Sequence, residues 1–276
     1  SRLFEIYKKL NRVSLKFNNY FQVYEELFSN FVNKRITFVE IGVMHGGSMF
    51  MWREYFGDQA RIIGIDLHPN AKELEKHGFE IYIGSQSDKK FWHDFYNQVG
   101  EIDILLDDGG HENNQQIITL DKAIPNIKDG GIVLIEDTHT SYKKRYGNPS
   151  KYSFINYSKY LVDVINSRFL NPELKIKNKH KKSIFSILYF ESMVAFKINR
   201  SKCVENIELA IDGKGLDNTH DLNRTDYFPK ISNYINKKFP KLHKIFIINK
   251  IMRKIFFSHN TLVKIKNYFI LKKYFK

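Results

Sequence analysis

Short apolar runs alternate with segments of helical spacing through the middle of the chain. The apolar runs are of strand length and cover Ile36–Ile41, Arg61–Asp66, Phe79–Ile83, Ile102–Leu106 and Ile132–Ile135. Between them, apolar residues recur every three or four positions in Ser48–Phe56, Ala71–His77, Ser87–Val99 and Asn113–Ile127. Strands that alternate with helices form parallel βαβ units, so the pattern predicts an α/β protein with a doubly wound sheet.

The chain on either side of this repeat has a different pattern. Residues 1–31 show helical spacing, which predicts a helical cap with a break at Asn18 and Asn19. After the repeat, Ser153–Phe169 again has helical spacing. Two β-rich runs, Ile184–Phe190 and Met193–Ile198, are then separated by only two residues, which is hairpin spacing. The pattern therefore predicts an antiparallel pair that closes the parallel sheet.

The C-terminal part is basic. Residues 228–276 contain 13 Lys and Arg and no Asp or Glu, so this segment carries nearly all of the net charge of +14. Its apolar residues have helical spacing, for example at Ile245, Ile248 and Met252. We therefore divide the chain into a helical cap (1–31), a sheet domain (32–200) and a basic, amphipathic extension (201–276). Its tail, residues 228–276, could lie on an anionic membrane, pack on another subunit or on the body of the protein, or bind nucleic acid. The repeated Ile and Phe of the tail favour burial over nucleic-acid binding.

Composition limits the cellular setting. A single cysteine, Cys203, excludes an internal disulfide and a cysteine-based zinc cluster. The sequence has no recognisable signal peptide and no apolar run near the ~20 residues that cross a bilayer. We therefore expect a cytoplasmic protein, with the option of peripheral attachment to the inner face of the membrane.

Acidic residues follow two of the predicted strands. Asp107, Asp108 and His111 come after one apolar run, and Glu136 and Asp137 come after another. In a parallel sheet these strand ends face the same crevice, where ligands bind. Carboxylates crowded there repel one another unless a cation lies among them, and oxygen ligands suit Mg²⁺ or Ca²⁺ better than zinc.

A glycine-rich turn follows the first predicted strand. Its spacing, Gly42 followed by Gly46 and Gly47, differs from the Gly-x-Gly-x-x-Gly of a dinucleotide site and fits a cofactor without phosphates. Asp66 ends the second strand, where a carboxylate can accept both ribose hydroxyls. An ordinary glycine turn and a helix-capping Asp are the alternative, but the two features at consecutive strand ends favour a nucleoside site.

These motifs resemble the class I S-adenosylmethionine-dependent methyltransferases. More narrowly, they are similar to metal-dependent sugar O-methyltransferases of macrolide biosynthesis and polysaccharide tailoring. The segments that carry the resemblance are 39–42, 46–48, 51–56, 64–66, 84–86, 107–111 and 135–137. The resemblance covers residues 17–147 well, the hairpin weakly and the extension not at all. It implies a Rossmann-like sheet of seven strands in the order 3-2-1-4-5-7-6.

The resemblance also assigns roles to single residues. Glu40 and Gly42 would line the methionine part of the cofactor, Asp66 would hold its ribose, and Ser85 and Gln86 would lie beside its adenine. The other expected cofactor-site residues are Gly46, Ser48 and Asp107. Asp108, Glu136 and Asp137 match the ligands of Mg²⁺ or Mn²⁺, and His111 matches the general base, with Asp108 beside it as a catalytic residue.

The residue types suit this chemistry. A divalent ion that binds neighbouring sugar hydroxyls lowers their pKa, and an imidazole can take the proton near neutral pH. Each residue also has a structural alternative: His111 could cap the helix that follows it, and Glu136 and Asp137 could be solvated at a strand end or cap a helix.

From these features we expect an O-methyltransferase that acts on a sugar or sugar-linked group. A cell-surface polysaccharide precursor, or its phosphorus-containing decoration, is the expected acceptor. Two alternatives stay open: an RNA methyltransferase that uses the basic extension, and a non-catalytic, membrane-associated binding subunit of the same fold.

Overall fold

A computed structural model describes residues 1–146, 151–169, 176–205, 268–269 and 271–275. The chain divides into two compact units, residues 1–208 and 209–276. The sheet and the candidate site both lie in the first unit. The predicted helices of the basic extension lie almost entirely outside the described residues. In the described part near its end, Tyr268, Phe269 and Leu271 are helical and a short 3-10 helix spans Lys272–Phe275.

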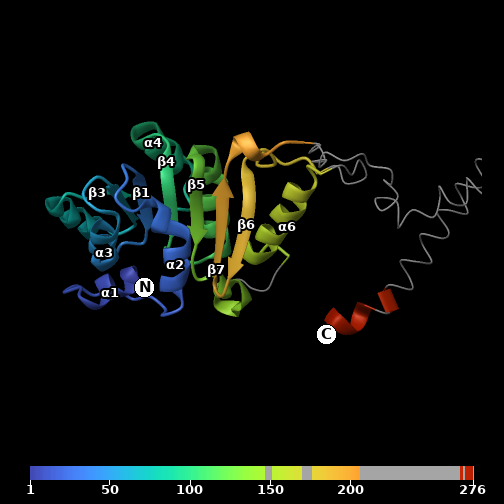
Figure 1. Ribbon diagram of the computed structural model, residues 1–276, viewed down its shortest axis with the longest axis horizontal. Coiled ribbons are helices and arrows are strands. Elements are labelled where there is room, and N and C mark those ends of the chain that lie inside the picture. The colour runs from blue at the N-terminus through green and yellow to red at the C-terminus, as the bar shows by residue number, and fades with distance from the viewer. Residues whose placement is uncertain (147–150, 170–175, 206–267, 270, 276) are drawn as a thin grey trace, which may run out of the picture. The chain divides into compact units, whose positions relative to one another are not determined.

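The first unit is built on a seven-stranded sheet (Figure 1). Its strands are β1 (Thr37–Ile41), β2 (Arg61–Asp66), β3 (Glu80–Ile83), β4 (Ile102–Asp107), β5 (Ile127–Ile135), β6 (Ile184–Phe190) and β7 (Met193–Ile198). They lie in the order β3-β2-β1-β4-β5-β7-β6. Strands β1 to β5 are parallel, and β7 pairs antiparallel with both β5 and β6. The predicted fold class and strand order are confirmed.

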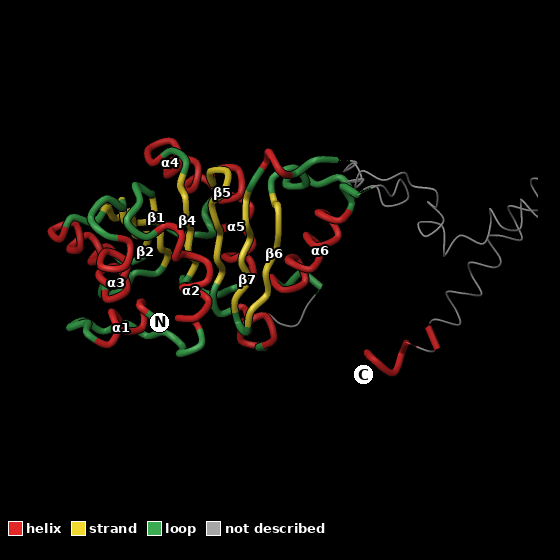
Figure 2. Tube along the Cα trace, viewed as in Figure 1, coloured by secondary structure: helices red, strands yellow, loops and turns green. Residues whose placement is uncertain are grey.

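Helices cover both faces of the sheet (Figure 2). On one face lie α1 (Arg2–Lys8), α2 (Tyr20–Phe28) and α3 (Gly47–Phe56). On the other face lie α4 (Lys89–Val99), α5 (Asn113–Ala123) and α6 (Phe154–Asn166). Short 3-10 helices span Ser29–Phe31, Pro69–His77, Ile124–Asn126, Thr138–Tyr142, Lys144–Tyr146 and Arg200–Lys202.

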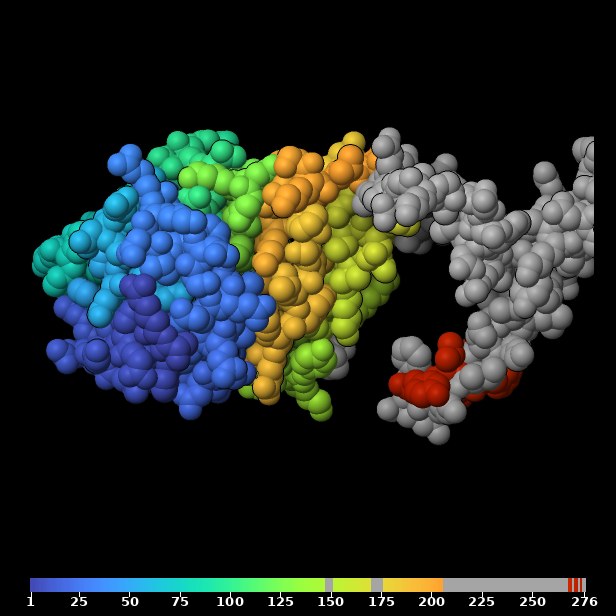
Figure 3. All heavy atoms as spheres, in the orientation of Figure 1, coloured from blue at the N-terminus to red at the C-terminus, as the bar shows by residue number. Residues whose placement is uncertain are grey.

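The N-terminal cap differs from its prediction. A break at Asn18 and Asn19 was expected, but residues 9–19 as a whole are non-helical. We call this segment the N-terminal strap. The strap contains Asn11 and Ser14 besides the two asparagines, and such side chains compete with helical hydrogen bonds. Figure 3 shows the N-terminal residues (blue) gathered on one face of the unit, beside the last two strands (orange).

Two further differences from the prediction concern a helix and a strand. The segment Pro69–His77 is a 3-10 helix instead of an α-helix. Strand β5 begins at Ile127, five residues before the predicted start. The residues that extend it include exposed Asp129 and Gly130, which depart from the apolar pattern used to find strands. No helix among the described residues is long and apolar enough to cross a bilayer.

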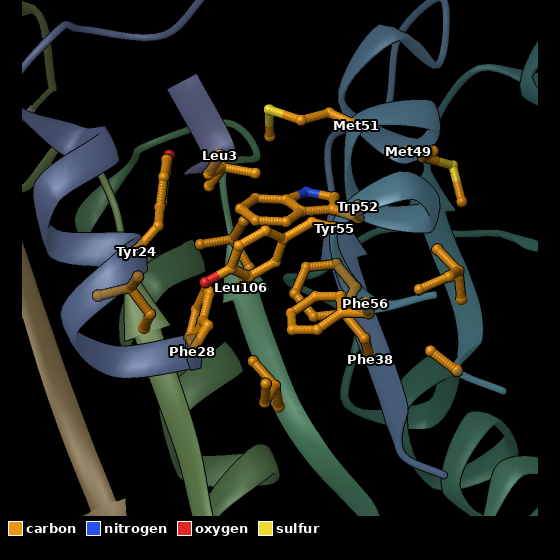
Figure 4. Close-up of a cluster of buried hydrophobic side chains, with 14 of the residues drawn as sticks. Leu3, Tyr24, Phe28, Phe38, Met49, Met51, Trp52, Tyr55, Phe56 and Leu106 are labelled. Atoms are coloured by element: carbon orange, nitrogen blue, oxygen red, sulfur yellow. The ribbon is translucent and has the colours of Figure 1, made fainter. Parts of the chain in front are cut away.

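Aromatic side chains fill the core on the side of α2 and α3 (Figure 4). The ring of Trp52 lies 5.1 Å from that of Tyr24, 5.8 Å from that of Phe28 and 5.0 Å from that of Phe38. All four side chains are fully buried. Truncation of a buried aromatic residue costs about 3–5 kcal/mol, so this cluster fixes α2 and α3 firmly on the sheet.

Candidate functional site

A cavity of about 680 Å³ opens at the carboxyl ends of the parallel strands. This is where an open α/β sheet binds its ligands, and the size suits a small-molecule site. The residues that line it come from α1, the N-terminal strap, α2 and the ends of the parallel strands β1 to β5: Tyr7, Leu15, Lys16, Phe17, Tyr20, Ile41, Gly42, Met44, Ile65, Asp66, Leu67, Gly84, Gln86, Asp108, Gly109, Gly110, His111, Glu136 and Asp137.

The glycine turn after β1 allows two loops to meet at the cavity. Gly42 has φ +85°, and a Cβ at this position would lie 2.2 Å from the carbonyl oxygen of Asp108. Any larger residue would push the two loops apart. Gly42 therefore brings the β1–α3 turn against the segment that carries Asp108 and His111.

Asp66 lies at the end of β2 with both carboxylate oxygens held. Oδ2 accepts hydrogen bonds from the backbone N–H groups of Val43 and Met44, each at 3.0 Å. Oδ1 accepts from the N–H of His68 at 2.8 Å. A carboxylate has about four acceptor positions, so a ribose could still donate to Asp66 where it lines the cavity.

A buried network supports the turn after β4. The Gln86 amide donates to Asp107 Oδ1 and Oδ2 at 3.0 and 2.9 Å, and its carbonyl accepts from the N–H of Gly110 at 2.9 Å. Burial raises the pKa of Asp107, against the effect of its hydrogen bonds. Asp107 does not line the cavity, so its contacts give it a supporting place behind Asp108.

Three groups at the other end of the cavity face one another. Each of Asp108, His111 and Asp137 offers one atom that could bind a metal ion, and these three atoms all lie within 4.8 Å of each other. His111 Nε2 is 3.5 Å from Asp137 Oδ2 and 4.0 Å from Asp108 Oδ1. Carboxylates are suitable ligands for a hard divalent ion such as Mg²⁺ or Mn²⁺, so Asp108 and Asp137 fit the expected metal, with the imidazole of His111 beside them.

The backbone and hydrogen bonds of His111 set it apart from an ordinary capping residue. Its φ is +58°, a left-handed conformation that is uncommon outside glycine. Its Nδ1 is buried and has no hydrogen-bond partner among the described residues. The N-cap of α5 is Glu112, which forms a capping box with Gln115. His111 is therefore not the N-cap of α5 and is free to act in the cavity.

A lysine ammonium lies among the other acids. Lys16 Nζ is 2.6 Å from Asp108 Oδ2, 3.2 Å from Glu136 Oε2 and 3.6 Å from Glu40 Oε1. Its side chain is only 2% exposed. The sequence argument required a cation among these carboxylates, and Lys16 supplies one from within the chain.

Burial and charge shift the pKa values of this cluster. Burial raises the pKa of Glu136 well above its ordinary value, and Asp108 and Glu40 add to the rise while Lys16 opposes it. For Lys16, burial favours the neutral amine, but the charges of Glu136, Asp108 and Glu40 outweigh it and raise its pKa. Lys16 is therefore a permanent cation at neutral pH.

Two tyrosines of α2 orient the pair of acids after β5. Tyr24 donates to Glu136 Oε1, and Tyr20 donates to Asp137 Oδ1 at 2.5 Å. Tyr20 also donates to Ser192 Oγ at 2.8 Å, and this hydroxyl lies 2.5 Å from His139 Nδ1. Helix α2 thus fixes Glu136 and Asp137 in different directions.

The structure brings together most, but not all, of the expected site residues. Gly42, Asp66, Gln86, Asp108, His111, Glu136 and Asp137 line one cavity. Glu40, Gly46, Ser48, Ser85 and Asp107 do not line it. Of these, Glu40 is fully buried and accepts from Ser48 Oγ at 2.7 Å, and Gly46 packs on Leu74.

The sequence analysis missed Lys16, Tyr20 and Tyr24. Lys16 is 92 residues from Asp108 and 120 from Glu136 in the chain, so no local spacing connects them. Its only sequence signal is a lysine between two apolar residues, Leu15 and Phe17, in a segment predicted to be helical.

The sheet order, the glycine turn and the acidic strand ends define a class I methyltransferase fold. Residues 39–138 match the family described as a methyltransferase domain. This match confirms the resemblance that the motifs predicted.

The curated relatives are sugar O-methyltransferases. The chain is 31% identical over 132 residues to 8-demethyl-8-alpha-L-rhamnosyl tetracenomycin-C 2'-O-methyltransferase of Streptomyces olivaceus, a match that covers 45% of this chain and 34% of the relative. It is 28% identical over 131 residues to mycinamicin VI 2''-O-methyltransferase of Micromonospora griseorubida, covering 45% and 32%. The chain spans about a third of the length of these relatives.

A solved structure extends the likeness in fold. The methyltransferase MycE of mycinamycin biosynthesis, solved with Mg, SAH and mycinamycin VI, matches with a TM-score of 0.67 at 22% identity. The match covers 78% of this chain and 57% of MycE. The predicted resemblance to metal-dependent sugar O-methyltransferases is therefore confirmed for the fold and for the methyltransferase domain.

Proposed function

We propose that this protein transfers a methyl group from S-adenosylmethionine to a sugar hydroxyl with the help of a divalent metal ion. One observation carries the proposal: a single cavity joins a glycine turn and Asp66, which suit a nucleoside, to Asp108, His111 and Asp137, which suit a cation. The named relatives, which are sugar O-methyltransferases, support the same acceptor chemistry.

In this proposal the two halves of the cavity have separate tasks. Gly42, Asp66 and Gln86 bind the cofactor, and Asp108 and Asp137 bind Mg²⁺ or Mn²⁺, with Glu136 the third ligand expected from the resemblance. When bound, the cofactor supplies a methyl group on a sulfonium, and the ion lowers the pKa of a hydroxyl next to it.

The residues of the chain then move one proton. The hydroxyl proton goes to His111 Nε2 as the oxygen–methyl bond forms and the sulfur–methyl bond breaks. The resulting imidazolium is stabilised by Asp137, whose Oδ2 is 3.5 Å from that nitrogen. The strap and α2 line one side of the cavity beside the reacting groups.

The finer identity of the acceptor stays a prediction. The names of the relatives describe methylation of sugars on small molecules. A cell-surface polysaccharide precursor offers the same chemistry, a sugar with free neighbouring hydroxyls.

Radiolabel transfer from S-adenosylmethionine tests the function directly. We expect the full chain to label a glycoside or nucleotide-sugar with free vicinal hydroxyls, to lose this activity in EDTA and to regain it with Mg²⁺. Asp137→Asn should lower turnover roughly 10- to 100-fold, whereas the exposed Asp94→Asn on α4 should not. Labelling that is unaffected by EDTA, or product labelled on nitrogen, would contradict the proposal.

A further inference from the structure

Among the described residues, Lys16 is a buried cation that the proposed function leaves unexplained. It lies at the bottom of the cavity, although it belongs to an irregular segment outside the sheet. Its ammonium contacts acids from three strand ends: Glu40 of β1, Asp108 after β4 and Glu136 after β5. The Nζ atom also lies 5.8 Å from the ring centre of Tyr24.

The strap is anchored so that Lys16 points inward. Tyr7 of α1 donates to the carbonyl oxygen of Ser14 at 2.7 Å. The carbonyl of Val13 rests on the start of α3, where a Cβ on Gly47 would lie 2.1 Å from it. The guanidinium of Arg12 lies 4.2 Å from the ring centre of Phe50. These contacts hold the strap against α1 and α3, and they keep the side chain of Lys16 in its buried position.

The contacts of Asp108 and Glu136 divide the acids into two groups. Asp108 turns Oδ2 toward Lys16, at 2.6 Å, and Oδ1 toward His111, at 4.0 Å. Glu136 turns both oxygens toward Lys16, at 3.5 and 3.2 Å, and also accepts from Tyr24. Glu136 is not part of the possible metal-binding group formed by Asp108, His111 and Asp137. Asp108 therefore faces both Lys16 and the position expected for the metal ion, whereas Glu136 faces only Lys16.

We propose that Lys16 is a positioning residue that acts as an internal cation: it takes Glu136 out of the metal-ligand set and leaves Asp108 and Asp137 to hold the divalent ion. The inference deepens the proposed function and rests on it. It departs from the ligand set that the resemblance implies, in which Glu136 binds the metal. It also gives the strap a function, which is to keep one positive charge beside the ion without blocking it.

Charge balance supports the arrangement in which both cations are bound together. Glu40, Asp108, Glu136 and Asp137 carry four negative charges when all are ionised. A divalent ion alone leaves two of them uncompensated in a buried site, which is costly, whereas Lys16 and the ion together leave one for a cationic cofactor. Displacement of Lys16 by the ion would also leave its own buried ammonium without partners.

Manganese binding in matched variants tests the inference. Mn²⁺ alone is titrated into the full chain and followed by electron paramagnetic resonance. Lys16→Met combined with Glu136→Gln removes a positive and a negative charge together, so the net charge of the site is unchanged. We expect this double variant to bind Mn²⁺ within about threefold of the original chain, whereas loss of a true ligand in Asp137→Asn should weaken binding roughly tenfold or more. Lys9→Met, on the exposed start of the strap, is the matched control.

A second readout follows the strap itself. Hydrogen exchange of residues 10–19 in the original chain should not change when Mn²⁺ saturates the site, because Lys16 keeps its place. Faster exchange in this segment on Mn²⁺ addition would show that the ion displaces Lys16 and would overturn the inference. This measurement needs no variant, so it holds even if Lys16→Met alone fails to fold.

The outcomes separate this inference from the proposed function. Mn²⁺ binding that is weakened tenfold in the folded double variant, as in Asp137→Asn, overturns the role of Lys16 and leaves the metal-dependent function intact. Absence of Mn²⁺ binding to the original chain overturns both. Circular dichroism and S-adenosylhomocysteine binding confirm that each variant is folded.

Discussion

At the scale of single residues, the site depends on how each carboxylate is oriented. Asp137 receives a hydrogen bond from Tyr20 and faces His111, whereas its neighbour Glu136 receives one from Tyr24 and faces Lys16. Two consecutive acids therefore have different partners, because α2 presents one tyrosine to each. Asp137 itself has φ +54°, which allows the chain to turn sharply after β5.

The proton acceptor is tested by substituting His111. We expect His111→Gln to lower turnover by about 10²–10⁴-fold, the usual loss when a general base is removed. The Kd for Mn²⁺ should stay within a few-fold, because Asp108 and Asp137 are unchanged. A Kd for Mn²⁺ that rises as much as in Asp137→Asn would instead make His111 a metal ligand. Full turnover in the variant would remove His111 from the mechanism.

Residue types at strand ends could be predicted, but their partners could not. Asp108, His111 and Asp137 stand next to apolar runs, so the sequence places them at one edge of the sheet. The pairing of Glu136 with Lys16 depends on a contact across 120 residues, and a lysine in a segment of helical spacing looks like an exposed position. The local sequence pattern therefore predicted the acidic residues of the site but not Lys16, the cation that pairs with them.

At the scale of elements, the sheet was the easiest part to predict and the N-terminal segment the hardest. Strands β2, β6 and β7 have the predicted bounds, because β2 begins and ends with a charged residue and the apolar runs of β6 and β7 are bordered by polar residues. The strap was predicted as helix, because its apolar residues have helical spacing. There Leu15 and Phe17 are exposed, whereas the side chain of Lys16 between them is buried, an alternation that suits an extended segment.

A buried histidine joins α5 to the loop before β6. His180 is 1% exposed, and its Nε2 lies 2.9 Å from Asp121 Oδ1. Burial lowers the pKa of His180 below its ordinary value of 6.5, although Asp121 acts in the opposite direction. In the unfolded chain the imidazole binds a proton below about pH 6.5, whereas in the folded protein it stays neutral to a lower pH.

Stability that depends on neutral His180 is therefore present above the unfolded pKa and is lost as the pH falls below it. Urea denaturation gives the free energy of unfolding of the original chain and of His180→Gln. We expect the stability advantage of the original chain over this variant to be smaller at pH 5.5 than at pH 7.5. His93→Gln, at an exposed position on α4, is the control. An equal difference between the original chain and His180→Gln at both pH values would contradict the assignment.

At the scale of the whole molecule, the sheet, α2 and the strap combine two binding tasks in one cavity. The aromatic cluster around Trp52 fixes α2, and α2 fixes Glu136 and Asp137 through its tyrosines. The core thus determines the geometry of the acids. The division of the chain at residues 31 and 200, and the role of the basic extension, stay predictions from the sequence.

The proposed reaction requires the cofactor and the ion to bind together in that cavity. Paramagnetic broadening of the S-methyl proton signal of S-adenosylmethionine by Mn²⁺ measures their proximity directly. We predict strong, selective broadening of the methyl signal with the original chain, and loss of the effect in Asp137→Asn although the cofactor still binds. A methyl signal that stays sharp while both cofactor and Mn²⁺ are bound would contradict the account.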